Sequence, residues 1–513
     1  MRSHFLVISL LVVALTFSGC SGVSSKMQSS NGGGSSAPQT VSFTPCVPGG
    51  TGIPCSFWGL QVNQLASYPV QIPYGQFRSW DSARANWPII EWCQAASGSP
   101  SDPCFNQNGS NQGWTNLDAE LADLKQQGRT DVFYTLSRTP AWASQNPNDT
   151  NCNYYRAGLL GECWPPTDLN QDGTGTNQIW RNWVAAIATR VNDATYLQTH
   201  AHIKYWETWN EFTRTTSWQG SNNQMVRLVE DANCIITGRV TAIIANGGEP
   251  CQHVLNSVGL TKSVDPQAVM VAPSPAGIDP VHLQAFLYCT NDPACTVGKA
   301  GANAVDVINV HLYVTMQTPE NVIEKGLPGL YARLQPAELQ KPLWNGEGSW
   351  GDTSVPGNIW VDDYAKAGFI PRYFALFWST GITENFWYGY DFGQLGQLYD
   401  PTTGKLKQPQ ANAWILTYNW LSHAVPAQSP FCQNSGTVYH CDFTEGNGHK
   451  ASLVWDTQYG QHCSNMSVPI VCGATNYNVP AQFNQDWIDL SGASHSAVST
   501  VMIGANPILL EGQ

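Results

Sequence analysis

The chain has 513 residues, enough for two or three average domains or for one large barrel with an appended domain. Its 24 basic and 37 acidic residues give a net charge of -13, and no basic run occurs, which argues against nucleic acid or an anionic membrane surface as a partner. Only 12% of the residues are charged, as in many secreted proteins, and the 21 Trp favour a carbohydrate partner because indole faces stack on sugar rings.

The N-terminus is typical of an export signal. Arg2 precedes an apolar run over residues 5–15, which is too short to span a bilayer permanently. The following Phe17-Ser18-Gly19-Cys20 resembles a bacterial lipoprotein box, so we expect a signal peptide over 1–20, a lipid anchor at Cys20 and a Ser/Gly-rich tether over 21–42. A lipoprotein at the outer membrane, periplasm or cell surface is therefore expected; Phe17, where Leu is usual, leaves cleavage by an ordinary signal peptidase and secretion as the alternative.

The cysteines predict disulfides. Removing Cys20 from the 15 leaves 14, an even number in an exported chain. No Cys-x-x-Cys or His-Glu-x-x-His occurs, so we predict no metal site among them and no cofactor. Neighbours in sequence should pair: Cys46 with Cys55, Cys93 with Cys104, Cys152 with Cys163, Cys234 with Cys251, Cys289 with Cys295, Cys432 with Cys441, and Cys463 with Cys472.

Strands and helices alternate along most of the chain, which predicts an α/β fold with a parallel sheet, here a (β/α)8 TIM barrel over 43–424. Short alternating strands at 437–443, 451–455 and 501–510 predict a small β-sandwich domain over 425–513. Helices are expected over about 115–127, 178–192, 223–236 and 361–379, the first with a capping box of Thr115 and Asp118. Barrel strands are expected within 57–62, 74–81, 132–136, 203–212, 268–273, 305–313, 341–350 and 383–390.

The loop before the second of these helices contains Asp168-Leu169-Asn170-Gln171-Asp172-Gly173, which matches the first half of a calcium-binding loop. Position twelve is Ile179 where a bidentate Glu is needed. We therefore predict an Asx-rich turn, with bound calcium between Asp168 and Asp172 as the alternative.

Two of the expected strands end in carboxylates. The fourth ends in Asn210-Glu211 and the seventh contains Glu347, each in aromatic surroundings. Side chains at the C-terminal ends of barrel strands face the active site, and paired carboxylates there fit glycoside hydrolysis. Arg78 on the second strand, and His311 and Tyr313 on the sixth, should lie in the same place.

These motifs resemble those of the clan A retaining glycoside hydrolases, most closely glycoside hydrolase family 39 and its relatives, over about residues 55–510. The resemblance rests on Trp206-Glu207-Thr208-Trp209-Asn210-Glu211, Val310-His311-Leu312-Tyr313, Gly346-Glu347 and Arg78. It implies a double-displacement mechanism, with a β-xyloside as the first expectation for the substrate. Phe212, where Pro often follows the Asn-Glu pair, and Gly346 before the nucleophile depart from the pattern.

The resemblance implies a role for each residue of the site. Glu211 is expected as the acid/base and Glu347 as the nucleophile, held ionised by Arg78 and Tyr313. Asn210 should donate to the sugar 2-hydroxyl, and His311 is either a substrate contact or a buried structural histidine. Trp387 is the expected floor for the reacting sugar, with Trp80, Trp142 and Trp350 as candidates for other subsites.

Three alternatives stay open at this point. A transglycosylase would use the same two carboxylates, and a non-catalytic surface protein could bind carbohydrate on the same barrel. Asp81 could cap a helix or pair with Arg84. The residues do not determine the sugar, the linkage, exo or endo attack, or the oligomeric state.

Overall fold

The fold is that of a computed structural model, which describes residues 52–63, 70–81, 85–109, 112–152, 160–393, 395–463 and 470–513. The expected signal peptide, Cys20, the tether and Cys46 lie outside the described residues, as does Arg84. Within the described ranges, no helix is long and apolar enough to cross a membrane.

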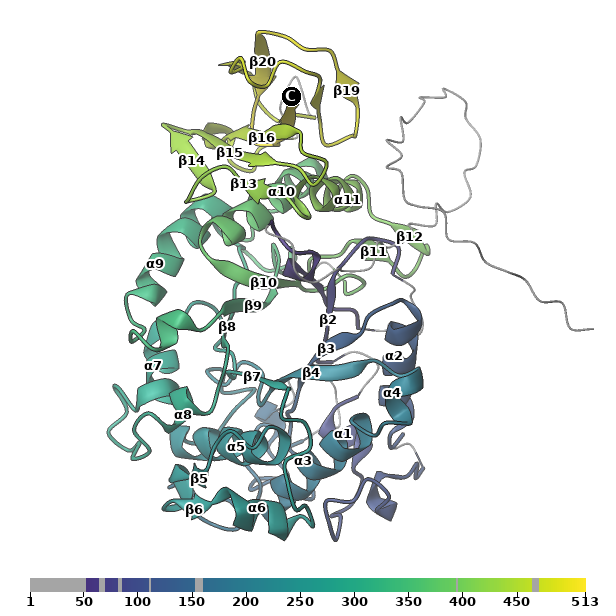
Figure 1. The fold of residues 1–513 in the computed structure, drawn as a ribbon, viewed down its shortest axis with the longest axis vertical. Coiled ribbons are helices and arrows are strands. Elements are labelled where there is room, and N and C mark those ends of the chain that lie inside the picture. The colour runs from purple at the N-terminus through teal and green to yellow at the C-terminus, as the bar shows by residue number, and fades with distance from the viewer. Residues whose placement is uncertain are drawn as a thin grey trace, which may run out of the picture. The chain divides into compact units, whose positions relative to one another are not determined.

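Eight parallel strands form the central sheet, in the order β7-β4-β3-β2-β1-β10-β9-β8 (Figure 1). The two ends of this order meet, because Val271 bridges Val307 in parallel and the Ala272 amide donates to the Val307 carbonyl at 2.9 Å. The expected (β/α)8 barrel is therefore confirmed. Its strands are β1 (Trp58–Leu60), β2 (Gln76–Ser79), β3 (Asp131–Thr135), β4 (His202–Glu207), β7 (Val269–Val271), β8 (Ile308–His311), β9 (Leu343–Gly348) and β10 (Ile382–Trp387).

Helices surround the barrel and bury their apolar faces against it. The main ones are α2 (Thr115–Gln126), α3 (Gln178–Val191), α5 (Asn222–Ile236), α7 (Pro280–Tyr288), α10 (Asp363–Ser379) and α11 (Gln410–Leu421). Shorter ones are α1 (Trp87–Ile90), α4 (Tyr196–Thr199), α6 (Cys251–Ser257), α8 (Ala300–Asn303) and α9 (Lys325–Tyr331).

The helix ends differ in part from expectation. The prediction of a capping box at Thr115 is wrong, because Thr115 lies inside α2. Asp118 instead accepts hydrogen bonds from Arg190 on α3, the shorter of which is 2.5 Å long. A capping box does occur on α5, between Ser221 and Gln224. Asp168 accepts the backbone amides of Gln178 at 2.5 Å and of residue 179 at 3.2 Å, so this loop caps α3 as an Asx-rich turn would.

The barrel interior below the strand ends is filled by aromatic and β-branched side chains. Phe133 packs edge to face against Trp344 and Phe386, which are tilted to each other, and the ring centroids lie 5.1–5.9 Å apart. This layer fills the barrel beneath the strand ends. Polar side chains that point inward above it are buried, so they must hydrogen-bond to one another.

The C-terminal residues form two antiparallel sheets, as expected for a sandwich. The larger has the order β13-β15-β16-β21-β18-β19 with β14 on β15, and the smaller pairs β17 with β20. The strand expected over 501–510 is broken near Pro507, so β20 and β21 lie in different sheets. The strands are β13 (Val425–Pro426), β14 (Cys432–Ser435), β15 (Val438–Thr444), β16 (Lys450–Asp456), β17 (Thr475–Asn478), β18 (Trp487–Ile488), β19 (Ser494–His495), β20 (Thr500–Ile503) and β21 (Ile508–Glu511).

The central strands of the larger sheet, β16 and β21, are buried on both faces. Leu453 and Trp455 on β16 belong to the same hydrophobic cluster as the barrel helices, whereas Val454 belongs to a second cluster with Ile503 of the smaller sheet. In Figure 1, α10 and α11 lie between the barrel strands and this sheet. The domain boundary at 424/425 stays a prediction, although the change from α11 to β13 falls beside it.

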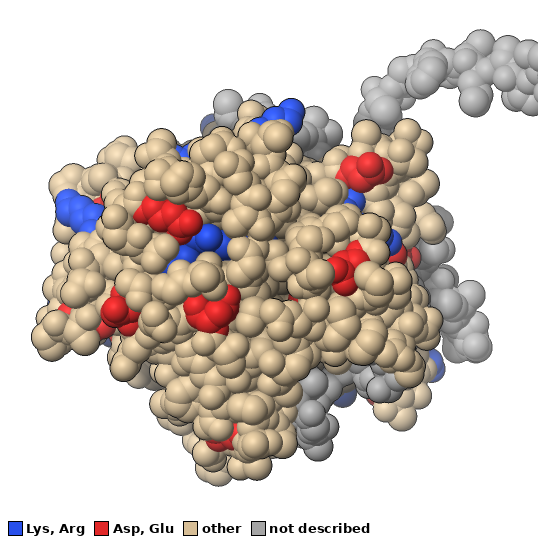
Figure 2. All heavy atoms as spheres, turned by 90° about the horizontal axis from the view of Figure 1, so that it is seen from below, with Lys and Arg blue, Asp and Glu red and all other residues tan. Residues whose placement is uncertain are grey.

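Six of the seven expected disulfides are present in the described residues, and these pairings are confirmed: Cys93–Cys104, Cys152–Cys163, Cys234–Cys251, Cys289–Cys295, Cys432–Cys441 and Cys463–Cys472. The expected partner of Cys55, Cys46, lies outside them. So many disulfides indicate an oxidising compartment, extracellular or periplasmic. On the face shown in Figure 2, charged side chains are scattered among uncharged ones, in line with the low charge content.

Candidate active site

The predicted site residues meet at the C-terminal ends of the barrel strands. Arg78 lies on β2, Asn210 and Glu211 follow β4, and Tyr313 follows β8. His311 is the last residue of β8, and Glu347 lies near the end of β9. All six are brought together, because parallel strands of a closed barrel present the same ends to one face.

The two carboxylates are close to each other and almost completely buried. A carboxylate oxygen of Glu211, one of Glu347 and a ring nitrogen of His311 all lie within 4.8 Å of one another. Glu211 is 3% exposed and Glu347 is 2% exposed. The backbone of Glu211 has φ 48°, in the left-handed region that non-glycine residues rarely adopt, which turns the chain sharply at the strand end.

Glu347 is held by two strong donors. Arg78 Nη1 donates to Glu347 Oε2 at 2.7 Å, and the Tyr313 hydroxyl donates to Glu347 Oε1 at 2.5 Å. Hydrogen bonds from a cation and a hydroxyl stabilise the ionised carboxylate and fix its orientation. Glu347 is thus the better placed of the two carboxylates to act as a nucleophile.

Glu211 has two cationic or potentially cationic neighbours. His311 Nδ1 lies 3.3 Å from Glu211 Oε1, and Arg214 Nη1 donates to Glu211 Oε2 at 2.9 Å. His311 also lies 3.8 Å from Glu347 Oε2, so its ring stands between the two carboxylates. The histidine is therefore part of the carboxylate cluster, and its other nitrogen, Nε2, is buried without a hydrogen-bond partner.

A third buried carboxylate, Glu207, was not predicted as a site residue. Its Oε2 accepts from Arg78 Nη2 and from the Thr135 hydroxyl, each at 2.7 Å. Its Oε1 accepts from Asn309 Nδ2 at 2.9 Å and from the Ser274 amide at 3.1 Å. The spacing was a signal in the sequence, because Glu207 lies two residues after Tyr205 and residues two apart on a strand face the same side. In the structure the Tyr205 ring packs against Trp344 of the barrel interior, so Glu207 points inward as well.

Asn210 is oriented by Arg78. Its Oδ1 accepts from Arg78 Nη2 at 2.7 Å, whereas its Nδ2 is buried and has no hydrogen-bond partner. The amide group is thereby fixed with its donor free. A buried donor without a partner costs free energy unless a ligand accepts from it, so this atom marks a position for a ligand oxygen.

The ionisation of the pair is set by these neighbours. Burial raises the pKa of Glu211, but the hydrogen bond and charge of His311 and the charge of Arg214 outweigh it and bring the pKa to about 2. Burial raises the pKa of Glu347, and the negative charge of Glu211 adds to this rise, against the opposing effects of His311 and Arg78. The Tyr313 hydrogen bond also opposes the rise at Glu347, whereas loss of the Arg214 contact would raise the pKa of Glu211.

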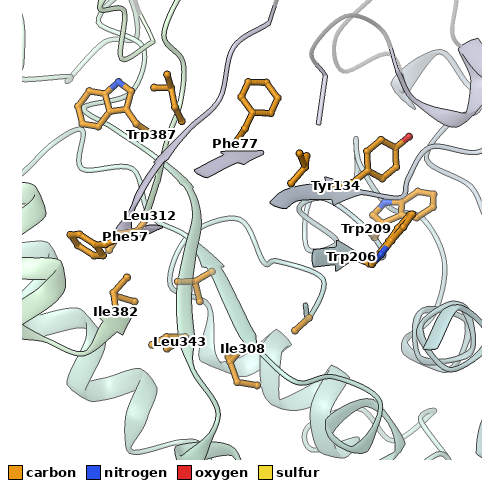
Figure 3. Packing of buried hydrophobic residues seen from close by; sticks show 14 of the residues in the cluster. Phe57, Phe77, Tyr134, Trp206, Trp209, Ile308, Leu312, Leu343, Ile382 and Trp387 are labelled. Carbon is orange, nitrogen blue, oxygen red and sulfur yellow. The ribbon is translucent and has the colours of Figure 1, made fainter. Parts of the chain in front are cut away.

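Trp387 lies away from this site. It is 0% exposed, packs against Phe374 and Trp414 of the outer helices, and donates from Nε1 to the Gly396 carbonyl at 2.7 Å. Figure 3 shows it among other buried hydrophobic side chains. The expectation of a sugar floor at Trp387 is not supported, because strand alternation turns this residue toward the helices.

Tyr388, the next residue, points to the site instead. Its hydroxyl donates to Asp81 Oδ2 at 3.1 Å, and its ring lies 6.5 Å from that of Tyr313. Asp81 also accepts from Gln61 Nε2 at 3.0 Å, and Gln61 in turn accepts from Arg78 Nη1 at 3.0 Å. Asp81 therefore belongs to the hydrogen-bond network of the site, which settles its role against a helix cap.

The other three candidate tryptophans occupy different places. Trp80 is buried between two guanidinium groups, 4.8 Å from Arg138 and 5.9 Å from Arg78, and so borders the site. Trp142 is half-buried and donates to the Glu91 carbonyl at 3.3 Å. Trp350 is 1% exposed and packs edge-on against Trp387, which makes it a core residue.

Two groups of described residues offer enough ligand atoms for a metal ion. Asp149, Cys152 and Cys163 form one, but the two cysteines are joined in a disulfide. Glu211, His311 and Glu347 form the other. Both carboxylates of this second group already bind arginines, at 2.7 and 2.9 Å, and a metal ion would have to compete with these cations.

Comparisons with known proteins give structural relatives only. Neither a protein-family model nor a curated protein matches the sequence. Among solved structures, a family 39 glycoside hydrolase from the gut symbiont Bacteroides cellulosilyticus WH2 is similar with a TM-score of 0.53 at 14% identity, covering 86% of this chain and 76% of that one. A conserved exported protein from Bacteroides fragilis has a TM-score of 0.52 at 9% identity, covering 86% of this chain and 89% of that one.

Likenesses at this level of identity establish the fold and nothing further. The chain therefore has the fold that its motifs implied, that of the family 39 glycoside hydrolase from Bacteroides cellulosilyticus.

Proposed function

We propose that this protein is a retaining glycoside hydrolase. One observation carries the proposal: oxygens of Glu211 and Glu347 lie within 4.8 Å of each other, although β4 and β9, which carry them, are not adjacent in the barrel. Retaining enzymes place their two carboxyl groups about 5 Å apart, whereas inverting enzymes need about 6.5–9.5 Å to admit a water. The short separation leaves room for direct attack on the sugar.

In the first half of the reaction, Glu347 attacks the anomeric carbon while Glu211 gives its proton to the departing glycosidic oxygen. Arg78 and Tyr313 keep the attacking oxygens ionised and aimed. The unpartnered Nδ2 of Asn210 donates to the sugar 2-hydroxyl, a contact that strengthens in the transition state. In the second half, Glu211 removes a proton from water, which hydrolyses the glycosyl–Glu347 ester.

Tyr388 replaces Trp387 as our candidate for the floor under the reacting sugar. Trp80 and Trp142 are the remaining aromatic candidates for neighbouring subsites. A β-xyloside is our first choice of substrate, by resemblance to family 39, and a transglycosylase with the same covalent intermediate would differ only in the acceptor. The lipid anchor at Cys20 is likewise a proposal.

Azide rescue tests the two carboxylate roles after a screen of nitrophenyl glycosides has identified an active substrate. Glu347→Ala should lose nearly all activity, and azide should then give the glycosyl azide of inverted configuration. Glu211→Ala should keep more activity on activated aryl glycosides than on substrates with poor leaving groups, and azide should give the retained product.

The anomeric configuration of each product is read by NMR. Wild-type release of inverted sugar would exclude the double-displacement mechanism. Wild-type turnover in both variants would exclude the two carboxylates. Products formed with an added alcohol or sugar acceptor, at the expense of free sugar, would favour the transglycosylase.

A further inference from the structure

Arg214 holds the carboxylate proposed as the acid, and its position is fixed by the turn that follows β4. The Arg214 amide donates to the Glu211 carbonyl at 3.0 Å, and the amides of Ser217 and Trp218 both donate to the Arg214 carbonyl at 2.8 Å. Phe212 is anchored to the Ser274 carbonyl at 3.1 Å. The backbone of the turn is therefore well held, and the guanidinium reaches back to Glu211 Oε2 at 2.9 Å.

This ion pair is asymmetric in its exposure. The Glu211 side chain is 4% exposed, whereas the Arg214 side chain is 45% exposed. Arg78 and Arg138, the arginines at the ends of β2 and β3, are both buried. Arg214 thus presents a guanidinium at the mouth of the site. Because this group is already in contact with solvent, a ligand can reach it without a rearrangement that first exposes it.

The pair conflicts with the acid role as it stands. A guanidinium at 2.9 Å favours the ionised carboxylate, but the leaving oxygen needs a protonated one. For reaction the contact must loosen. An anion supplied by the substrate can compete with Glu211 for the guanidinium, because Arg binds carboxylates through two parallel hydrogen bonds.

We propose that Arg214 binds a carboxylate on the leaving sugar, so that the preferred substrates are glycosides whose leaving group is a uronic acid. This inference rests on the proposed function. Arg214 lies on the leaving-group side, because Glu211 delivers its proton to the leaving oxygen. Binding exchanges the Glu211 carboxylate for that of the substrate, and Glu211, still buried beside Glu347, then takes up from solvent the proton that it transfers to the leaving oxygen.

The charge on the leaving sugar is the variable to test. Disaccharides that join the active glycone to D-glucuronic acid or D-galacturonic acid are compared with the methyl esters of the same disaccharides. Wild type should prefer the acid over the ester by about tenfold to a hundredfold in kcat/KM, the range expected for a hydrogen-bonded charge pair. Arg214→Gln should bring this ratio close to one, and Arg214→Lys should restore part of it.

A matched control is Arg333→Gln, which removes an exposed arginine located between α9 and β9, where the chain enters the opposite end of the barrel. This variant should keep the wild-type preference for the acid. An acid preference that survives in Arg214→Gln, or is absent from wild type while neutral aryl glycosides are hydrolysed, overturns the inference alone. Absence of hydrolysis with every glycoside overturns the proposed function, and the inference with it.

The pH profile gives a readout that a structural role would not move. His311 and Arg214 lower the pKa of Glu211 in the free enzyme, and kcat/KM requires Glu211 protonated. Removing Arg214 raises this pKa, so the alkaline limb of kcat/KM on a neutral substrate with a poor leaving group should move to higher pH in Arg214→Gln. An unmoved limb would contradict the proposed contact between Arg214 and the acid.

Discussion

Arg78 connects more of the site than any other described residue. Its two terminal nitrogens donate four hydrogen bonds, to Glu347, Glu207, Asn210 and Gln61, at 2.7–3.0 Å. Burial would lower the pKa of Arg78, but the charges of Glu207 and Glu347 raise it, so the guanidinium stays charged. A lysine could not replace it, because one ammonium cannot span two carboxylates in the plane that the guanidinium provides.

Tyr313 offers the cleanest test of how Glu347 is held. Tyr313→Phe removes the 2.5 Å hydrogen bond to Glu347 Oε1 and little else, since the ring is kept. A hydrogen bond to a charged group contributes about 1.5–3 kcal/mol, so kcat/KM should fall about tenfold to a hundredfold. The hydroxyl lowers the pKa of Glu347, and its loss raises that pKa, so the acid limb of the pH profile should move to higher pH.

The measurement is kcat/KM against pH for wild type and Tyr313→Phe on the same aryl glycoside. Tyr331→Phe is a suitable control, because that hydroxyl donates at 2.9 Å to the Thr380 carbonyl, away from the site. A Tyr313→Phe enzyme with the wild-type profile would show that Arg78 alone holds Glu347.

Sequence reasoning found the residues whose chemistry shows at a strand end. Glu211 and Glu347 stand out because each follows an apolar strand, and Arg78 because a charged residue is unusual on an inward-facing strand. Glu207 was missed since a Glu inside a strand is read as solvent-exposed by default. Arg214 was missed because it contacts Glu211 only through the left-handed backbone at Glu211, which no sequence pattern revealed.

At the end of β10, two consecutive residues have different roles: one packs in the core and the other lies at the site. Trp387 points to α10 and α11, and Tyr388 points to Asp81 in the site. Period-two alternation requires these neighbours to face opposite sides. The sequence analysis assigned the sugar contact to Trp387 because it is the larger aromatic residue, although its position places it in the core.

We expect mutation of Trp387 to affect mainly stability and mutation of Tyr388 to affect mainly activity. Trp387→Ala should destabilise the protein by about 3–5 kcal/mol, the range for a buried large aromatic side chain. Tyr388→Phe should leave the unfolding midpoint close to wild type, because the ring remains, and should lower kcat/KM because the contact with Asp81 is lost. Urea unfolding and steady-state kinetics on both variants give the two readouts.

The opposite result would support the expectation from the sequence that Trp387 is the floor under the reacting sugar. If Trp387→Ala kept full stability and lost substrate binding, Trp387 would be a sugar contact after all. The eight barrel strands, by contrast, each overlap the range that was expected for them from the sequence. Their ends could be predicted only approximately, since hydrogen bonding to neighbours decides where a strand stops.

At the scale of the whole molecule, the barrel and the sandwich are joined by buried polar contacts as well as by apolar packing. Arg372 on α10 binds Glu320 through two hydrogen bonds of 2.7 Å, and Trp455 Nε1 donates to the same Glu320 at 2.8 Å. Arg372 also donates to the Gly460 carbonyl at 3.0 Å. Breaking a buried ion pair is costly because it leaves an uncompensated charge.

The sandwich should therefore not behave as a detachable module. A chain that ends at residue 424 exposes the face of α10 that Trp455 and Ala505 cover, and a fragment of residues 425–513 exposes the barrel-facing side of β15 and β16. We expect each fragment to be poorly soluble or unfolded by circular dichroism, and co-expression of the two to recover soluble protein. A 43–424 fragment with wild-type unfolding midpoint and activity would contradict this.

The seam of the barrel bears on how the chain reaches this structure. β1 pairs with β10, joining Trp58 to Asn385, so the first strand to be synthesised waits for the last before the barrel can close. Pairings between residues this distant in sequence form slowly, because the intervening chain must be ordered first. Until that moment β1 and β10 each present an unpaired edge, and such an edge can pair with another copy of the chain.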